Sequence, residues 1–235
     1  MSTYVISDVH GCFDEFQALL AQIQFDQNQD VLYILGDVID RGPNPLACLR
    51  FIMKTKNVHL LRGNHEDMML NYIDAMPSNW EHNGGKVTQK QLLSEATEEE
   101  RDAIIRYLRK RPLYKTVGVN GKRYFLSHAG LTPGVPFNQQ TTRELVWNRE
   151  VFYGHKALPR HICIFGHTPT MAIRDNTDCS VWFDETHKDK ICIDSGCVFG
   201  GALAALRLDD YEVFYTKSRQ AYSGRYHFNE KSWIF

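Results

Sequence analysis

Residues 36–42 read Gly-Asp-Val-Ile-Asp-Arg-Gly and directly follow an apolar run at residues 31–35. Such a run is typical of a buried parallel strand, and open α/β sheets place their active sites in the loops at the carboxyl ends of these strands. Asp37 and Asp40 are therefore candidates for active-site residues. Because Gly and Asp are also the usual residues of turns, this segment alone fits an ordinary turn equally well.

Two further β-rich runs, residues 3–7 and 58–61, end in loops of the same kind. These loops contribute Asp8, His10, Asn64 and His65. Parallel neighbouring strands would bring all three loops to one edge of a sheet, where the side chains can converge. Carboxylates, imidazoles and an amide oxygen suit zinc, iron or manganese, and the lack of a thiolate here argues against a sulfur-rich structural zinc site. The sequence therefore predicts a catalytic metal centre.

The segments between these runs have the spacing of amphipathic helices. We expect helices at residues 13–24, 43–56, 66–74 and 96–110. Alternating strands and helices predict a parallel core with right-handed crossovers. From residue 113 onward the period changes to that of strands. The expected strands are 113–119, 122–127, 162–165, 191–194, 201–208 and 211–215.

Residues 78–85 interrupt this pattern with turn-forming residues around Trp80. Trp80 either stacks on or gates a substrate, or it packs on a neighbouring helix, which is the more common place for a lone Trp in a loop. Two later strands again end in a histidine loop, since residues 122–127 lead into His128 and residues 162–165 lead into His167. Both histidines join the candidate metal ligands.

The length and composition favour one domain. At 235 residues and 43% hydrophobic content the chain can bury a large core, and no Pro/Gly/Ser-rich linker divides it. We expect a catalytic domain over residues 1–216 and an extension of that domain, of unknown role, over residues 217–235. The net charge of -1 gives no overall attraction to nucleic acid or to an anionic membrane.

The cysteine spacing and the amino-terminal residues indicate the cellular compartment. The 6 cysteines form no Cys-x-x-Cys pair, no secretory leader precedes the first strand, and no apolar run approaches the roughly eighteen residues of a membrane span. We expect a cytoplasmic protein in a reducing environment. We also expect a monomer, or at most a weak dimer, with no nucleic-acid or membrane partner.

The donor set suits two divalent cations that share Asp37. One cation would be held by Asp8, His10 and Asp37. The other would be held by Asp37, Asn64, His128 and His167. Two metals about 3.5–4 Å apart are the known arrangement for in-line displacement at phosphorus. A hydroxide shared by the two ions would be the nucleophile, because bound cations depress the pKa of water.

The remaining polar residues of these loops can serve the leaving group and the phosphate. His65 stands outside the metal set, and Asp40 can orient it and stabilise its imidazolium form, so His65 is the candidate general acid. The nonbridging phosphate oxygens need a clamp, for which the planar fork of Arg suits better than Lys. Arg41 is the first candidate for this clamp, and Arg149 is the second.

These residues resemble the signature blocks of the calcineurin-like metallophosphoesterases, specifically the phosphoprotein phosphatase family. The blocks are Asp8-Val-His10-Gly11, residues 36–42, Gly63-Asn64-His65-Glu66, His128 and Gly166-His167. Residues 80–85, 146–150, 165–169 and 193–199 are similar to the branch of that family formed by the bacteriophage lambda phosphatase and its bacterial relatives. The resemblance runs from residue 4 to about residue 208.

The resemblance implies an α/β fold in which a two-sheet β-sandwich is flanked by helices. It implies manganese-supported hydrolysis without a phosphoenzyme, with iron and zinc as alternative metals. It also implies a serine/threonine phosphatase acting on a phosphoprotein or phosphopeptide, often accepting phosphotyrosine and aryl phosphates. The metal, acid and phosphate roles fall on the residues named above, and Asn64 also comes near the substrate.

Two other functions compete with this interpretation. Bacterial diadenosine tetraphosphatases look similar through the first three motifs, and a pyrophosphate link needs the same metals and clamp. The block at residues 147–150 and the lambda-like carboxyl half favour phosphomonoesters over the dinucleotide. The third alternative is a noncatalytic metal-binding scaffold, which the complete set of ligands and the acid pair argue against.

Overall fold

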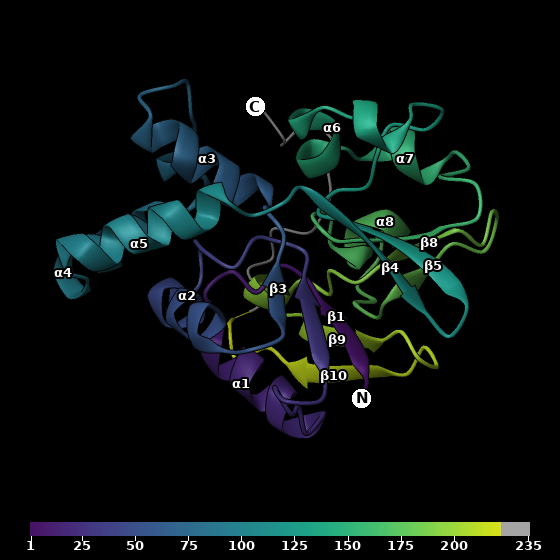
Figure 1. The fold of residues 1–235 in the computed structure, drawn as a ribbon, viewed down its shortest axis with the longest axis horizontal. Helices are drawn as coiled ribbons and strands as arrows, with labels where there is room; N and C mark the ends of the chain where they lie inside the picture. The colour runs from purple at the N-terminus through teal and green to yellow at the C-terminus, as the bar shows by residue number, and fades with distance from the viewer. Residues whose placement is uncertain (222–235) are drawn as a thin grey trace.

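The computed structural model describes residues 1–221, and two five-stranded mixed sheets form its centre (Figure 1). The first sheet has the order β10-β9-β1-β2-β3, and the second has the order β4-β5-β6-β8-β7. The first sheet is built from β1 (Thr3–Ile6), β2 (Val31–Ile34), β3 (Val58–Leu60), β9 (Ala202–Arg207) and β10 (Val213–Lys217). The second is built from β4 (Tyr114–Val119), β5 (Lys122–Ser127), β6 (Ile162–Phe165), β7 (Trp182–Phe183) and β8 (Lys190–Cys192).

Each sheet contains three neighbouring parallel strands, which reach one edge of the first sheet and lie at the centre of the second. In the first sheet β1 pairs with β2 and β2 with β3 in parallel, while β9 runs antiparallel to both β1 and β10. In the second sheet β5, β6 and β8 are parallel, and β4 and β7 pair antiparallel at the two edges. The parallel strands of each sheet therefore present their carboxyl-terminal loops together.

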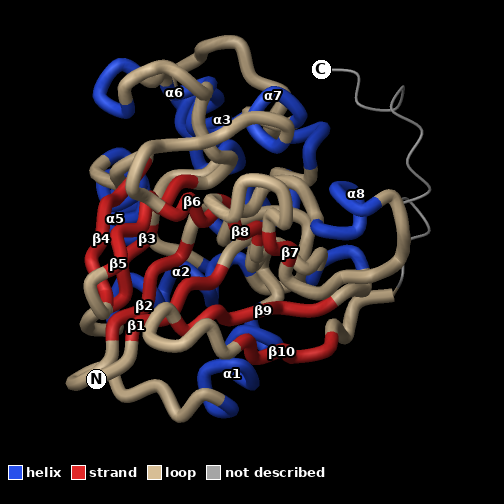
Figure 2. The backbone as a smooth tube through the Cα atoms, turned by 90° about the vertical axis from the view of Figure 1, so that its right-hand side faces the viewer, coloured by secondary structure: helices blue, strands red, loops and turns tan. Residues whose placement is uncertain are grey.

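The two sheets pack on each other through apolar side chains that both contribute. Val5 and Leu206 of the first sheet belong to one buried cluster with Leu126, Ile164 and Ile191 of the second. These strands read as near-continuous apolar runs because they are covered on both faces. The expected two-sheet sandwich is confirmed, with the helices on its outer faces (Figures 1 and 2).

The helices cover the sandwich on both sides. On the first sheet α1 packs against β9 and β10, α2 packs against β3 and α4, and α5 packs against α3. Short helices cover the second sheet, where Phe152 of α7 packs with Phe165 of β6. The helices are α1 (Phe13–Gln22), α2 (Pro45–Lys54), α3 (Asn64–Ile73), α4 (Lys86–Glu95), α5 (Glu98–Arg109), α6 (Thr142–Trp147), α7 (Glu150–Tyr153) and α8 (Thr170–Arg174). Three 3₁₀ turns lie at Glu81–Asn83, Phe137–Gln139 and Cys197–Phe199.

The start of the expected carboxyl-terminal extension is fastened to α1. The backbone N–H of Arg219 and the side-chain amide of Gln220 both donate to Glu15 Oε1, at 2.9 and 3.1 Å. Glu15 is only 1% exposed, so this segment supplies hydrogen bonds that a buried carboxylate needs. The rest of the extension, residues 222–235, lies outside the described residues, and the division at residue 216 stays a prediction. Among the described residues, every helix is too short or too polar to cross a lipid bilayer.

Candidate metal centre

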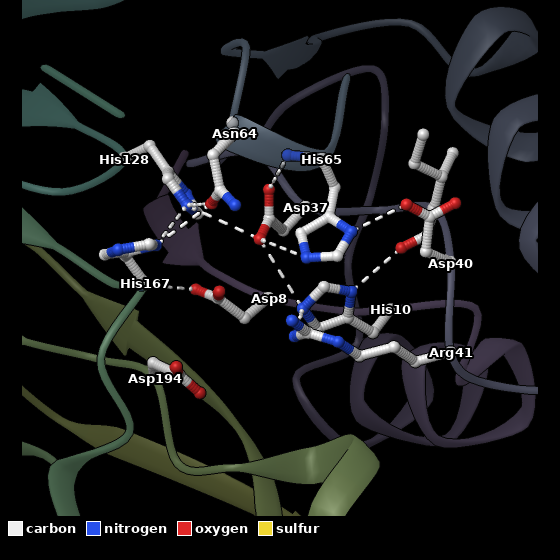
Figure 3. Close-up of polar contacts among 12 residues, drawn as sticks. Asp8, His10, Asp37, Asp40, Arg41, Asn64, His65, His128, His167 and Asp194 are labelled. Carbon is white, nitrogen blue, oxygen red and sulfur yellow. Dashed lines mark hydrogen bonds and ion pairs between the residues drawn. The ribbon is translucent and has the colours of Figure 1, made fainter. Parts of the chain in front are cut away.

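The loops after five parallel strands, three from the first sheet and two from the second, meet at one edge of the sandwich (Figure 3). The first sheet brings Asp8 after β1, Asp37 after β2 and Asn64 after β3. The second sheet brings His128 after β5 and His167 after β6. All of these side chains are buried, at 8% exposure or less. The sequence-predicted metal ligands, His10 included, are thus brought together.

Asp37 lies at the centre of this group. Its Oδ2 is 3.5 Å from His10 Nε2, 3.4 Å from His128 Nε2 and 3.9 Å from His65 Nε2. Its Oδ1 accepts a hydrogen bond of 3.0 Å from the backbone N–H of His65. Burial raises the pKa of Asp37 well above its ordinary value, and the nearby carboxylates of Glu66 and Asp8 raise it further. A cation among these groups would remove that penalty.

Backbone carbonyls orient the two imidazoles that flank Asp37. His10 Nδ1 is 2.8 Å from the carbonyl oxygen of Ile39, and His128 Nδ1 is 2.9 Å from that of Leu35. In each ring Nδ1 therefore carries the proton and donates it to the carbonyl, which leaves Nε2 with a free electron pair near Asp37. This is the arrangement that outer hydrogen bonds impose on metal-binding histidines. In His10 that electron pair accepts a hydrogen bond from Arg41 Nη1 at 2.7 Å.

A second set of electron-pair donors meets beside Asp37. Asn64 Oδ1 is 2.7 Å from His128 Nε2 and 3.0 Å from His167 Nδ1, and the two imidazole nitrogens are 3.2 Å apart. The ligand atoms of Asp37, His128 and His167 lie within 4.8 Å of one another, as do those of His10, Asp37 and His65. These two buried sets of ligand atoms share the carboxylate of Asp37 and can hold two divalent cations. The residues present therefore fit a dimetal centre.

Asp8 stands at the side of the second set. Its Oδ2 accepts from the backbone N–H of His167 at 3.0 Å and from the hydroxyl of Ser7. Gly166 lets this loop approach, because a Cβ at that position would overlap both Ser7 Oγ and Asp8 Oδ2. The metal-binding role of Asp8 stays a prediction, since its oxygens lie outside both compact sets of ligand atoms.

The backbone of the site residues is strained. Asp8, His10, Asp37 and His167 all have positive φ angles, of 51°, 43°, 53° and 67°. Non-glycine residues rarely adopt the left-handed region, which costs on the order of 1 kcal/mol or more at each position. Four such residues within one cluster show that the fold holds these side chains against a local conformational preference, as is common at functional sites.

Two buried carboxylates of the site were given no role from the sequence. Glu66 joins the second and third loops, since its Oε2 accepts from the backbone N–H groups of Asp37 and Gly63, both at 2.8 Å, and its Oε1 accepts from Val38 at 2.9 Å. Burial raises the pKa of Glu66 to about 7. Asp194 lies two residues after β8 and faces the same group (Figure 3). Its position after an apolar strand is the signal that could have found it.

His65 and Asp40 form a buried hydrogen-bonded pair. His65 Nδ1 is 2.6 Å from Asp40 Oδ2, and neither residue is exposed to solvent. Burial raises the pKa of Asp40 to about 7, whereas burial and the charge of Arg41 lower the pKa of His65. The pair therefore shares one exchangeable proton near neutral pH. Within the described part of the chain, His65 Nε2 has no hydrogen-bond partner, so it is the atom that can pass this proton onward.

Trp80 belongs to the support of this pair. Its side chain is only 2% exposed, and its Nε1–H donates to both oxygens of Asp40, at 3.0 and 2.8 Å. Thr88, on α4, donates its hydroxyl to Asp40 Oδ1 at 2.6 Å. Burial rules out the stacking or gating role that the sequence left open for Trp80. The residue instead positions the carboxylate that orients His65.

Replacing Trp80 with Phe should lower kcat about tenfold and move the alkaline limb of the pH profile to higher pH. The indole N–H stabilises ionised Asp40, and a hydrogen bond to a charged group contributes about 1.5 kcal/mol. Without it the His65–Asp40 pair keeps its proton to higher pH, but more of that proton resides on Asp40. The kcat profile against pH measures both effects. Trp182→Phe, on β7, is the matched control, and an alkaline limb that stays in place would remove Trp80 from this role.

The two arginines border a cavity above the cluster. The cavity has a volume of about 340 Å³ and is lined by Arg41 and Arg149 together with Asp37, Asn64 and His65. Arg41 Nη1 is 2.7 Å from His10 Nε2, and Arg149 Nη1 donates to Thr168 Oγ1 at 2.8 Å. Both guanidinium groups line the cavity, and their role as a phosphate clamp stays a prediction.

The metallophosphoesterases have this architecture. They combine a two-sheet sandwich with a buried cluster of carboxylates and imidazoles where the carboxyl ends of the strands of both sheets meet. The sequence matches the calcineurin-like phosphoesterase family over residues 1–202, and the chain belongs to that family. Enzymes of this family use a dimetal centre, which agrees with the donor set described above. The family expected from the sequence is confirmed.

Curated relatives point to one kind of substrate. A protein of Erwinia tasmaniensis is 28% identical over 94% of this chain and 98% of its own length. One from Klebsiella pneumoniae is 39% identical over 57% of this chain, and one from Enterobacter sp. is 34% identical over 72% of it. These two alignments cover 44% and 57% of the relatives, about half of their length. All three relatives are named symmetrical bis(5'-nucleosyl)-tetraphosphatases.

Solved structures show the same fold with different named activities. A structure assigned to a diadenosine tetraphosphatase has a TM-score of 0.67 at 21% identity and covers 92% of this chain and 93% of its own. A serine/threonine phosphatase of Saccharomyces cerevisiae has a TM-score of 0.61 at 18% identity, with 93% and 79% covered. At such low identity these similarities establish the fold alone.

The expectation of a protein serine/threonine phosphatase with a phosphoprotein substrate is wrong, because the curated relatives are named as dinucleoside tetraphosphatases. The error came from the weight given to residues 147–150. That block places Trp147 and Arg149 on the cavity above the cluster, and Arg149 is held by Thr168. A guanidinium clamp binds the nonbridging oxygens of an ester or an anhydride equally well, so the block does not distinguish the two substrates.

Proposed function

We propose that this protein hydrolyses dinucleoside polyphosphates, and that it splits the central phosphoanhydride of diadenosine tetraphosphate to release two molecules of ADP. The observation that carries the proposal is the alignment with the Erwinia tasmaniensis relative, which is named for this symmetrical activity and is matched over 94% of this chain and 98% of its own length. The convergence of the cluster and two arginines on one cavity fits the phosphate part of this substrate, as it would fit that of a phosphate ester.

In this proposal the cluster holds two divalent cations, most favourably Mn²⁺, with iron or zinc as alternatives. The residues that hold them are Asp8, His10, Asp37, Asn64, His128 and His167. When bound, the cations neutralise phosphate charge and activate water as a nucleophile near neutral pH. The buried donors exclude bulk water and keep the ligands in place, because backbone carbonyls orient His10 and His128, and Glu66 joins the loops that carry Asp37 and Asn64.

The chain's own residues bind the phosphates and handle the leaving group. Arg41 and Arg149 clamp the nonbridging oxygens of the phosphate that is attacked, and Asn64 lies beside them. His65 delivers a proton from Nε2 to the departing phosphate oxygen, and Asp40 stabilises the charged imidazole meanwhile. A phosphate oxygen leaves more readily than an alkoxide, so we expect this proton to contribute at the lower end of the general-acid range.

The deciding experiment compares two substrates on the same protein. kcat/KM is measured for diadenosine tetraphosphate and for a phosphothreonine peptide, with metal-stripped protein and with protein reloaded with Mn²⁺, and the products are separated by chromatography. We expect metal-dependent turnover of the dinucleotide to ADP alone. Formation of AMP and ATP would contradict the symmetrical cleavage. A faster reaction with the phosphopeptide would contradict the substrate class.

Replacing Arg149 with Ala should raise KM for the dinucleotide about tenfold or more while changing kcat less. The variant removes a guanidinium from the phosphate cavity, and a hydrogen bond to a charged group contributes about 1.5–3 kcal/mol. The inhibition constant of inorganic phosphate should rise in parallel. The matched control is Arg160→Ala, at a distant hollow next to β6. Unchanged phosphate inhibition in the Arg149 variant would exclude this residue from the clamp.

A further inference from the structure

A second hollow adjoins the cavity above the metal cluster. Its volume is about 570 Å³, and its lining is Asp67, Thr132, Thr142, Arg143, Glu144, Trp147 and Asn148. Asp67 of α3 and Trp147 of α6 also line the first cavity, so the two spaces share a border. Both views place α3 and α6 at the same end of the molecule (Figures 1 and 2). The roles assigned above leave this second hollow without a function.

The second hollow adds side chains that the first cavity lacks. The first cavity carries the guanidinium groups of Arg41 and Arg149 and the carboxylates of Asp37, Asp67 and Asp194. The second shares Asp67, which pairs with Arg62 at 3.4 Å, and adds the carboxylate of Glu144 and the guanidinium of Arg143. Carboxylates accept hydrogen bonds from sugar hydroxyls, as acidic residues do for ribose in dinucleotide sites. Glu144 is therefore suited to bind the hydroxyls of a sugar.

The remaining lining suits a nucleobase. The indole of Trp147 and the planar guanidinium of Arg143 are both groups on which bases stack. The hydroxyl of Thr142 adds a hydrogen-bonding group that can act as donor or acceptor. Trp147 is the one large apolar residue of this lining, the other six residues are polar or charged, and the volume lies within the usual range for sites of small organic ligands.

Local hydrogen bonds hold the walls of this hollow in place. Glu144 Oε2 accepts from the backbone N–H of Thr141 at 2.5 Å, and the backbone N–H of Glu144 donates to Thr141 Oγ1 at 3.3 Å, which caps α6. These bonds lower the pKa of Glu144, so its carboxylate is ionised at neutral pH. Asn148 Nδ2 donates to the carbonyl oxygen of Leu131 at 2.7 Å. Such preorganisation reduces the entropic cost of binding.

We infer that the second hollow binds one nucleoside of a dinucleoside polyphosphate, while the phosphates lie over the metal cluster and its arginines. The inference rests on the proposed function and extends it. The ribose hydroxyls donate to Glu144 or Asp67, and the base lies against Trp147. A substrate with phosphates in the middle and a nucleoside at its end matches two adjoining spaces, of which the first holds Arg41 and Arg149 and the second adds Glu144 and Arg143. The second hollow thus selects dinucleotides over simple phosphate esters.

The test fills the second hollow without touching the cluster. Thr142 is the first residue of α6 and its side chain is only partly buried, so Thr142→Trp adds bulk to the hollow without overfilling the core. The matched control is Thr116→Trp on the exposed face of edge strand β4. kcat/KM is measured for diadenosine tetraphosphate, and pyrophosphate is measured as a competitive inhibitor because it reaches only the cluster and its arginines.

We expect kcat/KM for the dinucleotide to fall about tenfold or more in Thr142→Trp, mainly through KM, which corresponds to about 1.4 kcal/mol. The inhibition constant of pyrophosphate should stay within about twofold of the parent value, and Thr116→Trp should behave as the parent. Arg143→Ala replaces an exposed side chain of the same hollow and should also raise KM for the dinucleotide. This second variant tests the inference if Thr142→Trp does not fold.

Two results would overturn the inference. The first is an unchanged kcat/KM for the dinucleotide in both Thr142→Trp and Arg143→Ala. The second is an equal loss of dinucleotide turnover and pyrophosphate affinity, because the disturbance would then lie at the cluster. Failure of the proposed function itself gives a different result, in which the unaltered protein loaded with Mn²⁺ does not hydrolyse diadenosine tetraphosphate at all.

Discussion

Asp37→Asn should lose its bound divalent metal and its hydrolytic activity together, with kcat/KM reduced by about three orders of magnitude or more. Asp37 belongs to both compact ligand sets, so an amide in its place weakens both metal sites at once. Metal content measured by mass spectrometry after reloading, together with kcat/KM on the dinucleotide, tests this expectation. A variant that keeps full activity would remove Asp37 from the shared position.

Thermal stability separates loss of metal from misfolding. In the metal-free protein, burial and the carboxylates of Glu66 and Asp8 raise the pKa of Asp37, so its ionised form is unfavourable in the folded state above the ordinary carboxyl pKa. The neutral amide removes this cost, and metal-free Asp37→Asn should melt no lower than metal-free parent protein at neutral pH. The rise in Tm on adding Mn²⁺, which reflects binding to the folded state, should be lost.

A matched control exists for this substitution. Asp175 has a φ angle of 53°, the same value as Asp37, and it lies at the end of α8 outside the site. Asn tolerates the left-handed region well, so Asp175→Asn tests the backbone effect of the same change. This control should keep its metal, its activity and its Mn²⁺-dependent rise in Tm. Loss of activity in both variants would attribute the effect at Asp37 to the backbone.

His65→Asn should keep its metal but lose about two orders of magnitude in kcat. General acid catalysis contributes roughly 10²–10⁴-fold, and the lower end applies because the leaving group is a phosphate oxygen. His65 Nδ1 is 2.6 Å from Asp40 and its Nε2 has no hydrogen-bond partner among the described residues, so the change removes the proton donor itself. Metal content and kcat on the dinucleotide are measured on the same preparation.

The leaving group and the pH profile sharpen this test. An ester with a poorer leaving group should lose more activity in His65→Asn than the dinucleotide does, and the alkaline limb of the kcat profile should disappear. His155→Asn, an exposed histidine after α7, is the control and should leave both quantities unchanged. His65 also lies within one of the compact ligand sets. Loss of metal from His65→Asn would therefore assign it to the cluster in place of the acid role.

Much of the fold follows from local sequence patterns. The apolar runs at residues 3–7, 31–35 and 58–61 correspond to β1, β2 and β3, and the run at 162–165 corresponds to β6. Such runs are predictable because a strand covered on both faces needs apolar residues throughout. Helix α3 begins at Asn64, two residues before the expected start, so Asn64 and His65 belong to its first turn.

The missed elements lack a periodic signal of their own. Helix α4 is predominantly polar, and its only buried residues are Thr88 and Leu92. Helices α6, α7 and α8 have 6, 4 and 5 residues, and strand β7 has 2. Elements this short are stabilised by packing against the rest of the molecule rather than by their own hydrophobic pattern. Helix α4 nevertheless supplies Thr88 to Asp40, and α6 forms a wall of the second hollow.

The residues of the site also divide into those that a local sequence pattern predicts and those that only tertiary contacts reveal. Asp8, His10, Asp37, Asn64, His128 and His167 were found in the sequence because each follows a strand, and a strand end is a local signal. Glu66 and Trp80 support the site through contacts that cross tens of residues, from Glu66 to Asp37 and from Trp80 to Asp40. No local pattern encodes such contacts, because their geometry exists only when the loops are folded together.

Local patterns predicted most of the strands and the set of candidate ligands, since apolar runs and strand-end donors are readable along the chain, and the resemblance of the signature blocks indicated the family. The choice between a phosphoprotein and a dinucleotide was not readable, because the residues around the cluster bind phosphate in either substrate. The tertiary structure decided which loops meet, which carboxylates are buried, and that a second hollow adjoins the cavity above the cluster. Those features depend on the packing of two sheets and on helices from distant parts of the chain, which is where substrate shape is recognised.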